Sequence, residues 1–140
     1  MLTMVNKAML HPQEIETYYV IPTIRKYIAL FLVEQGRKQK DVAALLGIHT
    51  AAISQYRSKK RGMQITLPAE ILVEVKKSAS RIKDHFSYFQ ETQRLLHLIR
   101  KTRVLCQIHH QFSPIPQGCD PHKIGCITKM TTKMTSKECV

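Results

Sequence analysis

Apolar residues recur along this 140-residue chain at intervals of three and four, which is the spacing of amphipathic helices rather than of strands. The first clear case begins at Pro22, continues through Ile28 and Leu32, and stops before Gly36. Proline is favoured at the first position of a helix and glycine just beyond its end. The pattern therefore predicts a helix over residues 22–35 that is buried on most sides.

Two shorter helices joined by a tight turn are predicted over residues 39–58. Val42 and Leu46 lie on one apolar stripe of the first helix. Gly47 follows that stripe, at the place where a helix end favours a residue that tolerates positive φ. The second helix begins near residue 50 and turns Ile53 inward.

The outward face of this second helix carries almost no charge. When Ile53 and Tyr56 face inward, small or hydrogen-bonding side chains face outward. These side chains are Thr50, Ala51, Ser54, Gln55 and Ser58. A face of this kind is unusual for a helix that meets only solvent, and it suits a helix that meets base edges.

Positive charge is concentrated around this pair of helices. The whole chain carries +12 at pH 7, and residues 37–61 hold seven basic residues against one acidic residue, so they alone carry +6. The basic residues are Arg37, Lys38, Lys40, Arg57, Lys59, Lys60 and Arg61. A neutral face flanked by cations is expected in a DNA-binding protein, because contacts with phosphates position the protein and contacts with bases determine which sequence it binds. For the last four of these residues, Arg57 to Arg61, the alternative explanation is the helix dipole, which favours cations at a helix C-terminus.

The segment 39–58 resembles the helix-turn-helix of phage-repressor (XRE-like) transcriptional regulators. The residues that carry the resemblance are Ala43, Gly47, Ile48 and Ile53. With Tyr19–Arg25 (YVIPTIR) and Ser58–Gly62 (SKKRG), the likeness extends to small predicted archaeal regulators with a Cys-containing C-terminal region. It implies a DNA-binding repressor-like domain, with Gln39 at the phosphate-contacting position. An ordinary helical hairpin in an all-α domain is the alternative.

If the second helix enters the major groove of DNA, individual side chains can be given roles in binding. Gln55 and Thr50 are the candidates for base-edge hydrogen bonds, because Gln bonds adenine at two points and Thr donates or accepts. Ala51 would contact a thymine methyl, and Ser54 shares the same face. The residues expected to hold the phosphate backbone are Arg57, Lys59, Lys60 and Arg61.

Two further helices are predicted beyond residue 67. The first begins at Pro68 and turns Ile71 and Val75 inward. The second is a long helix from about Tyr88 or Phe89 to Phe112. A heptad-like seam along it consists of Leu95, Leu98, Thr102, Leu105, His109 and Phe112. The seam either packs onto the chain's own domain or forms a homodimer, as repressors that span two half-sites require.

Cys106, His109, Cys119, His122 and Cys126 form a second constellation. Its spacing is C-x-x-H, nine residues, C-x-x-H, three residues and C. Thiolates and imidazoles suit Zn²⁺ in tetrahedral geometry, and an iron–sulfur cluster on the three cysteines with a histidine is the alternative. Free cysteines with scattered histidines are the remaining interpretation, because the spacing departs from common zinc-finger forms.

Composition narrows the classes of function. Ten acidic residues, no glycine-rich phosphate loop and no matched Ser/His/Asp set argue against an enzyme. No apolar run approaches the roughly 18–20 residues of a membrane span, and the N-terminus lacks a signal-peptide pattern. We therefore expect a cytoplasmic protein that binds double-stranded DNA. A basic membrane-surface protein and an RNA-binding or antitoxin-type module using the same helices are the alternatives.

The expected organisation is all-α: a repressor-like helical domain, then a long C-terminal helix with a small Cys/His appendage. Residues 1–13 are expected to be a loose N-terminus and residues 14–84 the helix-turn-helix domain. Residues 85–126 would form the C-terminal helix and Cys/His segment, and residues 127–140 a disordered tail.

Overall fold

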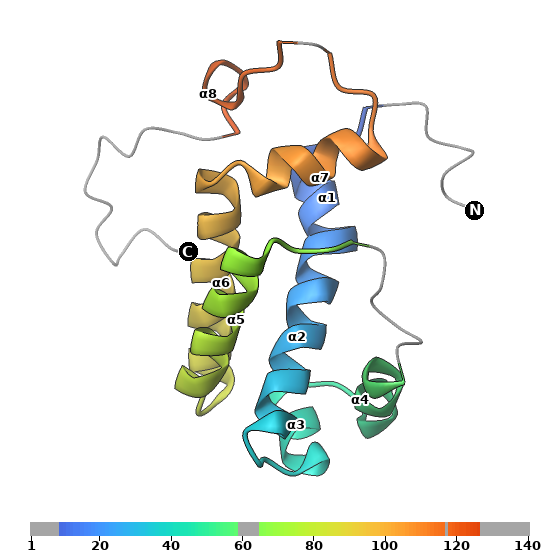
Figure 1. Cartoon of the computed structure of the whole chain (residues 1–140), viewed down its shortest axis with the longest axis vertical. Helices are drawn as coiled ribbons and strands as arrows, with labels where there is room; N and C mark the ends of the chain where they lie inside the picture. Colours follow the sequence, from blue (N-terminus) through green and yellow to red (C-terminus); the bar gives the residue numbers. More distant parts are fainter. Residues whose placement is uncertain (1–8, 59–64, 117, 127–140) are drawn as a thin grey trace.

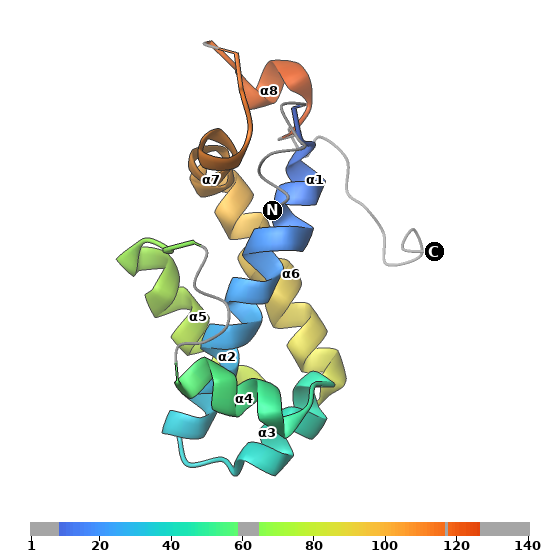
Figure 2. The ribbon, with the colours of Figure 1, turned by 90° about the vertical axis from the view of Figure 1, so that its right-hand side faces the viewer.

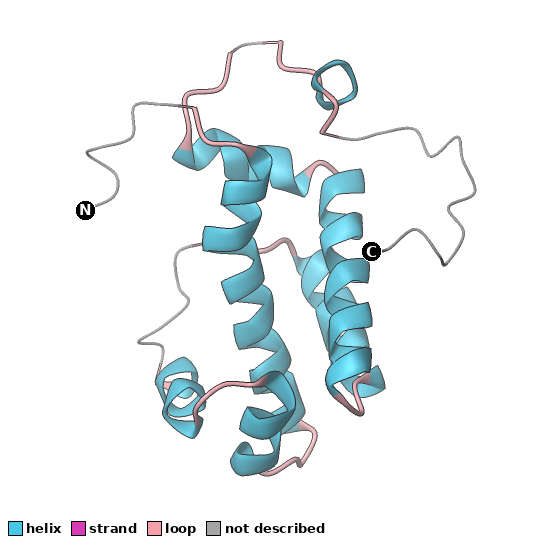
Figure 3. Ribbon diagram, turned by 180° about the vertical axis from the view of Figure 1, so that it is seen from behind, coloured by secondary structure: helices cyan, strands magenta, loops and turns pink. Residues whose placement is uncertain are grey.

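The computed structural model describes residues 9–58, 65–116 and 118–126, and in these ranges the chain forms helices, turns and loops without a strand (Figure 3). The predicted all-α class is confirmed. The elements in chain order are α1 (Pro12–Ile15), the π-helical turn η2 (Glu16–Val20), α2 (Ile21–Glu34), α3 (Gln39–Leu46), α4 (Thr50–Arg57), α5 (Ala69–Arg81), α6 (His85–Lys101), α7 (Val104–Phe112) and α8 (Pro121–Ile124). The predictions for residues 1–8 and 127–140 concern parts of the chain outside the described residues.

Helix α2 is the central element of the fold. It runs along the long axis of the molecule, with α5 and α6 beside it, α3 and α4 at one end, and α7 and α8 at the other (Figures 1 and 2). Ile24, Ile28 and Leu32 of α2 are at most 1% exposed. The helix predicted over residues 22–35 is therefore confirmed, including its burial.

Helix α2 continues an earlier helical stretch instead of starting at Pro22. A proline has no N–H, and its ring would clash with the carbonyl four residues before it. The backbone widens just upstream, where the Ile21 N–H donates to the carbonyl of Glu16, five residues back. The Thr23 hydroxyl donates to the Tyr19 carbonyl at 2.7 Å. The π-helical turn thus lets one continuous helix pass through the proline.

The prediction of one long helix from residue 88 to residue 112 is wrong, because the chain forms two helices there, α6 and α7. Helix α6 also starts earlier, where Asp84 accepts from the Ser87 N–H at 2.7 Å and caps its first turn. At the other end the Thr102 hydroxyl donates to the Leu98 carbonyl at 2.8 Å, and Arg103 adopts φ 62°. A left-handed arginine costs about 1–2 kcal/mol.

The break turns α7 across the end of α1, so that its apolar side packs against the N-terminal helical stretch (Figure 2). Leu105 and Ile108 are at most 4% exposed there. Phe112 stacks on Tyr19 with 4.0 Å between the ring centroids. This burial offsets the unfavourable backbone at Arg103.

Of the two interpretations of the heptad-like seam, packing onto the chain's own domain describes the structure. Leu95 is fully buried and Leu105 is 4% exposed, and both belong to the single core cluster that also contains α2. These two leucines are therefore used within the chain, whereas Thr102 of the seam is exposed and Leu98 is half-buried.

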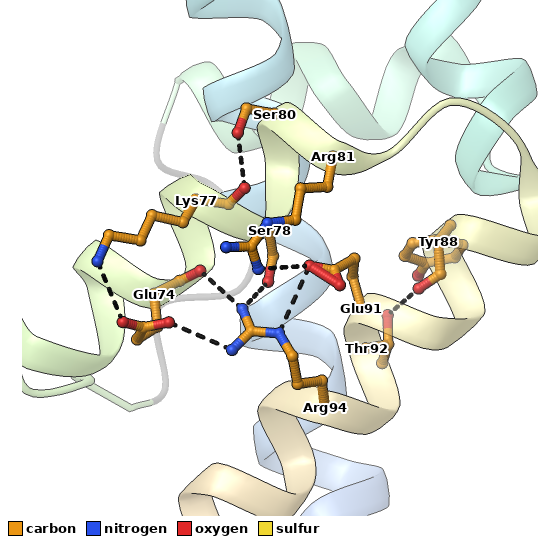
Figure 4. Close-up of polar contacts among 9 residues, drawn as sticks. All are labelled: Glu74, Lys77, Ser78, Ser80, Arg81, Tyr88, Glu91, Thr92 and Arg94. Carbon is orange, nitrogen blue, oxygen red and sulfur yellow. Dashed lines mark hydrogen bonds and ion pairs between the residues drawn. The ribbon is translucent and has the colours of Figure 1, made fainter.

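A polar network joins α5 to α6 (Figure 4). Arg94 on α6 donates to Glu74 at 3.2 Å and to the Ser78 hydroxyl at 2.5 Å, both on α5. The hydrogen bond from Arg94 holds the pKa of Glu74 below its usual range. In the opposite direction, Arg81 of α5 donates to Glu91 of α6 at 3.3 Å. The network fixes the relative register of the two helices.

We predict that Leu95→Ala lowers the free energy of unfolding by about 2–5 kcal/mol, because it removes a fully buried side chain from the core. Chemical denaturation of the purified protein measures this loss. The control is His97→Ala on the exposed side of the same helix, which should change stability by less than about 0.5 kcal/mol. Unchanged stability with an altered oligomeric state in Leu95→Ala would contradict the assignment.

Candidate nucleic-acid interface and Cys/His cavity

Helix α3 ends in a left-handed turn at Gly47, which has φ 67° and ψ 36°. The Ile48 N–H donates to the Ala43 carbonyl at 3.0 Å, and the Gly47 N–H donates to Ala44 at 3.3 Å. This pair of bonds is the Schellman arrangement, which satisfies the last carbonyls of a helix. The turn sends the chain directly into α4, as the sequence predicted.

Helix α4 packs by the face that was expected to be internal. Ile53 is fully buried and Tyr56 is 5% exposed. Ala43 of α3 is 4% exposed, and α3 and α4 both pack against α2. A small residue at Ala43 allows two helices to approach closely. The two helices and their turn therefore form a compact unit at one end of the molecule (Figure 1).

The opposite face of α4 is open. The exposed residues are Thr50, Ala51, Ser54, Gln55, Arg57 and Ser58. Two of their hydroxyls bond to their own helix: Ser54 donates to the Thr50 carbonyl at 3.4 Å and Ser58 donates to the Gln55 carbonyl at 3.1 Å. Both hydroxyl oxygens can still accept a hydrogen bond.

Cations border the unit at the start of α3. Lys38 and Lys40 are exposed on either side of the half-buried Gln39. Arg37 has a structural role instead, because its Nη2 donates to the Ile82 carbonyl at 2.6 Å. From the sequence, Lys38 and Lys40 were considered only as part of the net charge. Because the structure exposes them beside Gln39, we add them to the candidate phosphate contacts. Lys59, Lys60 and Arg61 lie outside the described residues.

At the other end of the molecule, the Cys/His segment encloses a cavity of about 270 Å³ between the N-terminal stretch, α7 and the segment around α8. Four of the five predicted metal ligands line it: Cys106, His109, Cys119 and Cys126. Apolar side chains, including Leu105, form much of the remaining wall. The three cysteines are free thiols.

The fifth predicted ligand, His122, is exposed and does not line the cavity. Its backbone N–H donates to the Asp120 carboxylate at 2.9 Å, which caps α8. His11 lines the cavity instead, although nothing in the sequence links it to cysteines almost a hundred positions away. His110 is exposed and also borders the cavity.

His109 is held by the N-terminal stretch. Its Nε2 lies 2.6 Å from the Leu10 carbonyl oxygen, and the Leu10 N–H donates to the Ser113 hydroxyl at 2.8 Å. These contacts join residues about a hundred positions apart in the chain. They attach the stretch before α1 to α7 and to Ser113, which directly follows it.

Burial raises the pKa of the Cys106 thiol, and the neighbouring Cys126 and Cys119 raise it further. The three cysteines line the same cavity. Within the described part of the chain, however, no group of three or more His, Cys, Asp or Glu side chains has the geometry of a metal site.

Comparison with known proteins assigns no family: no family model matches the chain, and no significant match occurs among curated proteins or solved structures. Among the described helices, none combines the length and the apolar character needed to cross a bilayer.

We predict that Gly47→Ala lowers the free energy of unfolding by about 1 kcal/mol. A Cβ at this position would meet no atom within 4 Å, so the loss comes from the left-handed backbone alone. Gly47→Asn should lose less, because asparagine tolerates this conformation. Thermal and denaturant unfolding compare the three proteins, and an alanine variant as stable as the parent would contradict the argument.

Proposed function

We propose that this chain is a sequence-specific regulator of transcription that binds double-stranded DNA through α4. The observation that carries the proposal is the division of α4 into two faces. Its inner face is buried through Ile53 and Tyr56, while its outer face is neutral and rich in small or hydrogen-bonding groups. A helix of this kind fits the major groove, where base edges offer donors, acceptors and methyl groups.

Charge around the outer face supports the same proposal. Arg57 is exposed at the end of α4, and Lys38 and Lys40 are exposed at the start of α3. Cations on two sides of a neutral face suit contacts with phosphates on both sides of a groove. The half-buried Gln39 would donate to a phosphate between the two lysines. The proposal assigns a binding function in the cytoplasm and no catalytic step.

The first experiment is selection of bound sequences from a random double-stranded DNA pool, with a salt titration of the same binding. Enrichment of one motif would support a sequence-specific regulator. Binding without enrichment, with affinity falling steeply as salt rises, would indicate a non-specific basic binder. A preference for RNA over duplex DNA would favour the RNA-binding or antitoxin-type alternative.

We predict that Gln55→Ala weakens binding to the selected duplex by about 1–3 kcal/mol and relaxes the preference at one base position, because a bidentate contact is lost. Its binding to random duplex should stay unchanged. Fluorescence anisotropy on both duplexes measures the difference.

Arg57→Ala is the matched control on the same helix. It should weaken binding to both duplexes alike and reduce the salt slope by about one, because it removes a phosphate contact. An equal loss on both duplexes for Gln55→Ala would assign Gln55 to backbone binding instead.

The proposal includes a homodimer, since two copies would place two α4 helices in half-sites about one helical turn apart. Leu95 and Leu105 of the predicted seam pack within the chain, so we place the contact with a second copy on another apolar surface. Phe86 and Phe89 are 71% and 67% exposed, one turn apart at the start of α6. Large aromatic side chains exposed together favour association.

We predict that the double substitution Phe86→Ser and Phe89→Ser converts a dimer to a monomer in sedimentation velocity. Thermal stability measured on the monomer should change little, because both rings are exposed. Val73→Ser removes another exposed apolar side chain, 54% accessible on α5, and should leave the dimer intact. A dimer that survives the double substitution would place the interface elsewhere.

A further inference from the structure

Three thiols from separate parts of the chain meet at one cavity. Cys106 lies on α7, Cys119 on the loop before α8, and Cys126 just after α8. All three are free and half-buried. Much of the surrounding wall is apolar, including Leu105 and Ile124. Soft thiolate ligands in partly dry surroundings select zinc and other thiophilic cations over magnesium or calcium.

His109 is already oriented as a metal-binding histidine would be. Cys106 and His109 are three positions apart on α7, so they share one helix face. The Nε2 of His109 lies 2.6 Å from the Leu10 carbonyl oxygen. A carbonyl only accepts, so the ring proton lies on Nε2 and Nδ1 carries the free lone pair. Metal-bound histidines commonly donate their other N–H to a backbone carbonyl in this way.

We propose that this cavity binds one Zn²⁺ ion through the Sγ atoms of Cys106, Cys119 and Cys126 and the Nδ1 atom of His109. Each thiol gives its proton to solvent as the metal binds. The ligand set is the three-cysteine, one-histidine combination of tetrahedral structural zinc sites. His122, which the sequence spacing favoured equally, is left out of the proposed set because it is exposed and does not line the cavity.

Zinc binding includes a movement of the chain around α8. Among the described residues no three ligand groups yet have metal-site geometry, so Cys119 and Cys126 must move toward α7. The loop and the four-residue helix α8 carry these two cysteines, and α8 has only Pro121 buried. A segment with so little buried surface can move at small energetic cost.

The site would fasten the two ends of the described chain together. His109 and Ser113 already hold Leu10, which is two residues before α1. A metal on His109 would fix the ring that donates to the Leu10 carbonyl and join it to the segment around α8. The proposal stands independently of DNA binding, because the cavity lies at the end of the molecule opposite α3 and α4 (Figure 1).

The experiment is titration of the full-length, reduced, metal-free protein with Co²⁺, a spectroscopic substitute for Zn²⁺. We expect one Co²⁺ per chain, visible bands of a tetrahedral complex, a thiolate charge-transfer band of three sulfurs, and displacement by one equivalent of Zn²⁺. Less than one equivalent, an octahedral spectrum, or an iron–sulfur chromophore in the protein as isolated would each overturn the proposal.

Variants test the ligand set. Cys119→Ser, on the loop, and His109→Ala should each weaken Co²⁺ binding at least tenfold. His122→Ala should bind Co²⁺ as the parent does. His109→Ala also loses the contact with Leu10, so circular dichroism accompanies each titration. If His109→Ala is unfolded, Cys119→Ser carries the test, because Cys119 lies on a loop outside α7. Greater loss in His122→Ala than in Cys119→Ser would overturn the assignment.

Discussion

The burial of α2 is the constraint on which the rest of the structure depends. Ile24, Ile28 and Leu32 lie at the centre of the core, and α3, α4, α5 and α6 all pack against this helix. Burying each such side chain contributes about 1.5–3 kcal/mol. Because α2 is surrounded, its neighbours have few alternative positions, and the α3–turn–α4 unit is held at one end of the molecule without a large core of its own.

A second consequence is that the two ends of the molecule are physically connected. The helical stretch α1–η2–α2 begins beside the Cys/His cavity and ends just before α3 (Figures 1 and 2). Near its start, Glu16 is 7% exposed and accepts hydrogen bonds from Arg100 of α6, one of them at 3.0 Å. A charge this buried is tolerated because it is paired. The pair anchors the stretch to α6.

The two proposals therefore concern separate surfaces of one helical framework. The neutral outer face of α4 and the nearby lysines concern recognition of DNA, while the thiols and His109 concern a structural metal. They place different demands on the residues involved. The side chain proposed to read bases, Gln55, is exposed, whereas the proposed metal ligand, His109, is oriented by a neighbour, the Leu10 carbonyl. The framework meets both demands at opposite ends.

The sequence by itself determined the features that depend on neighbouring residues. Periodic apolar positions predicted α2 to α5, Gly47 predicted the left-handed turn, and the placement of Ile53 and Tyr56 separated the two faces of α4. Tertiary structure alone decided the break at Arg103, because no glycine or proline marks it and the burial of α7 against α1 offsets its strain. It likewise decided that His109 and not His122 faces the thiols, since both have the same C-x-x-H spacing. Local spacing fixes which residues share a helix face, but only packing between distant segments determines what that face meets.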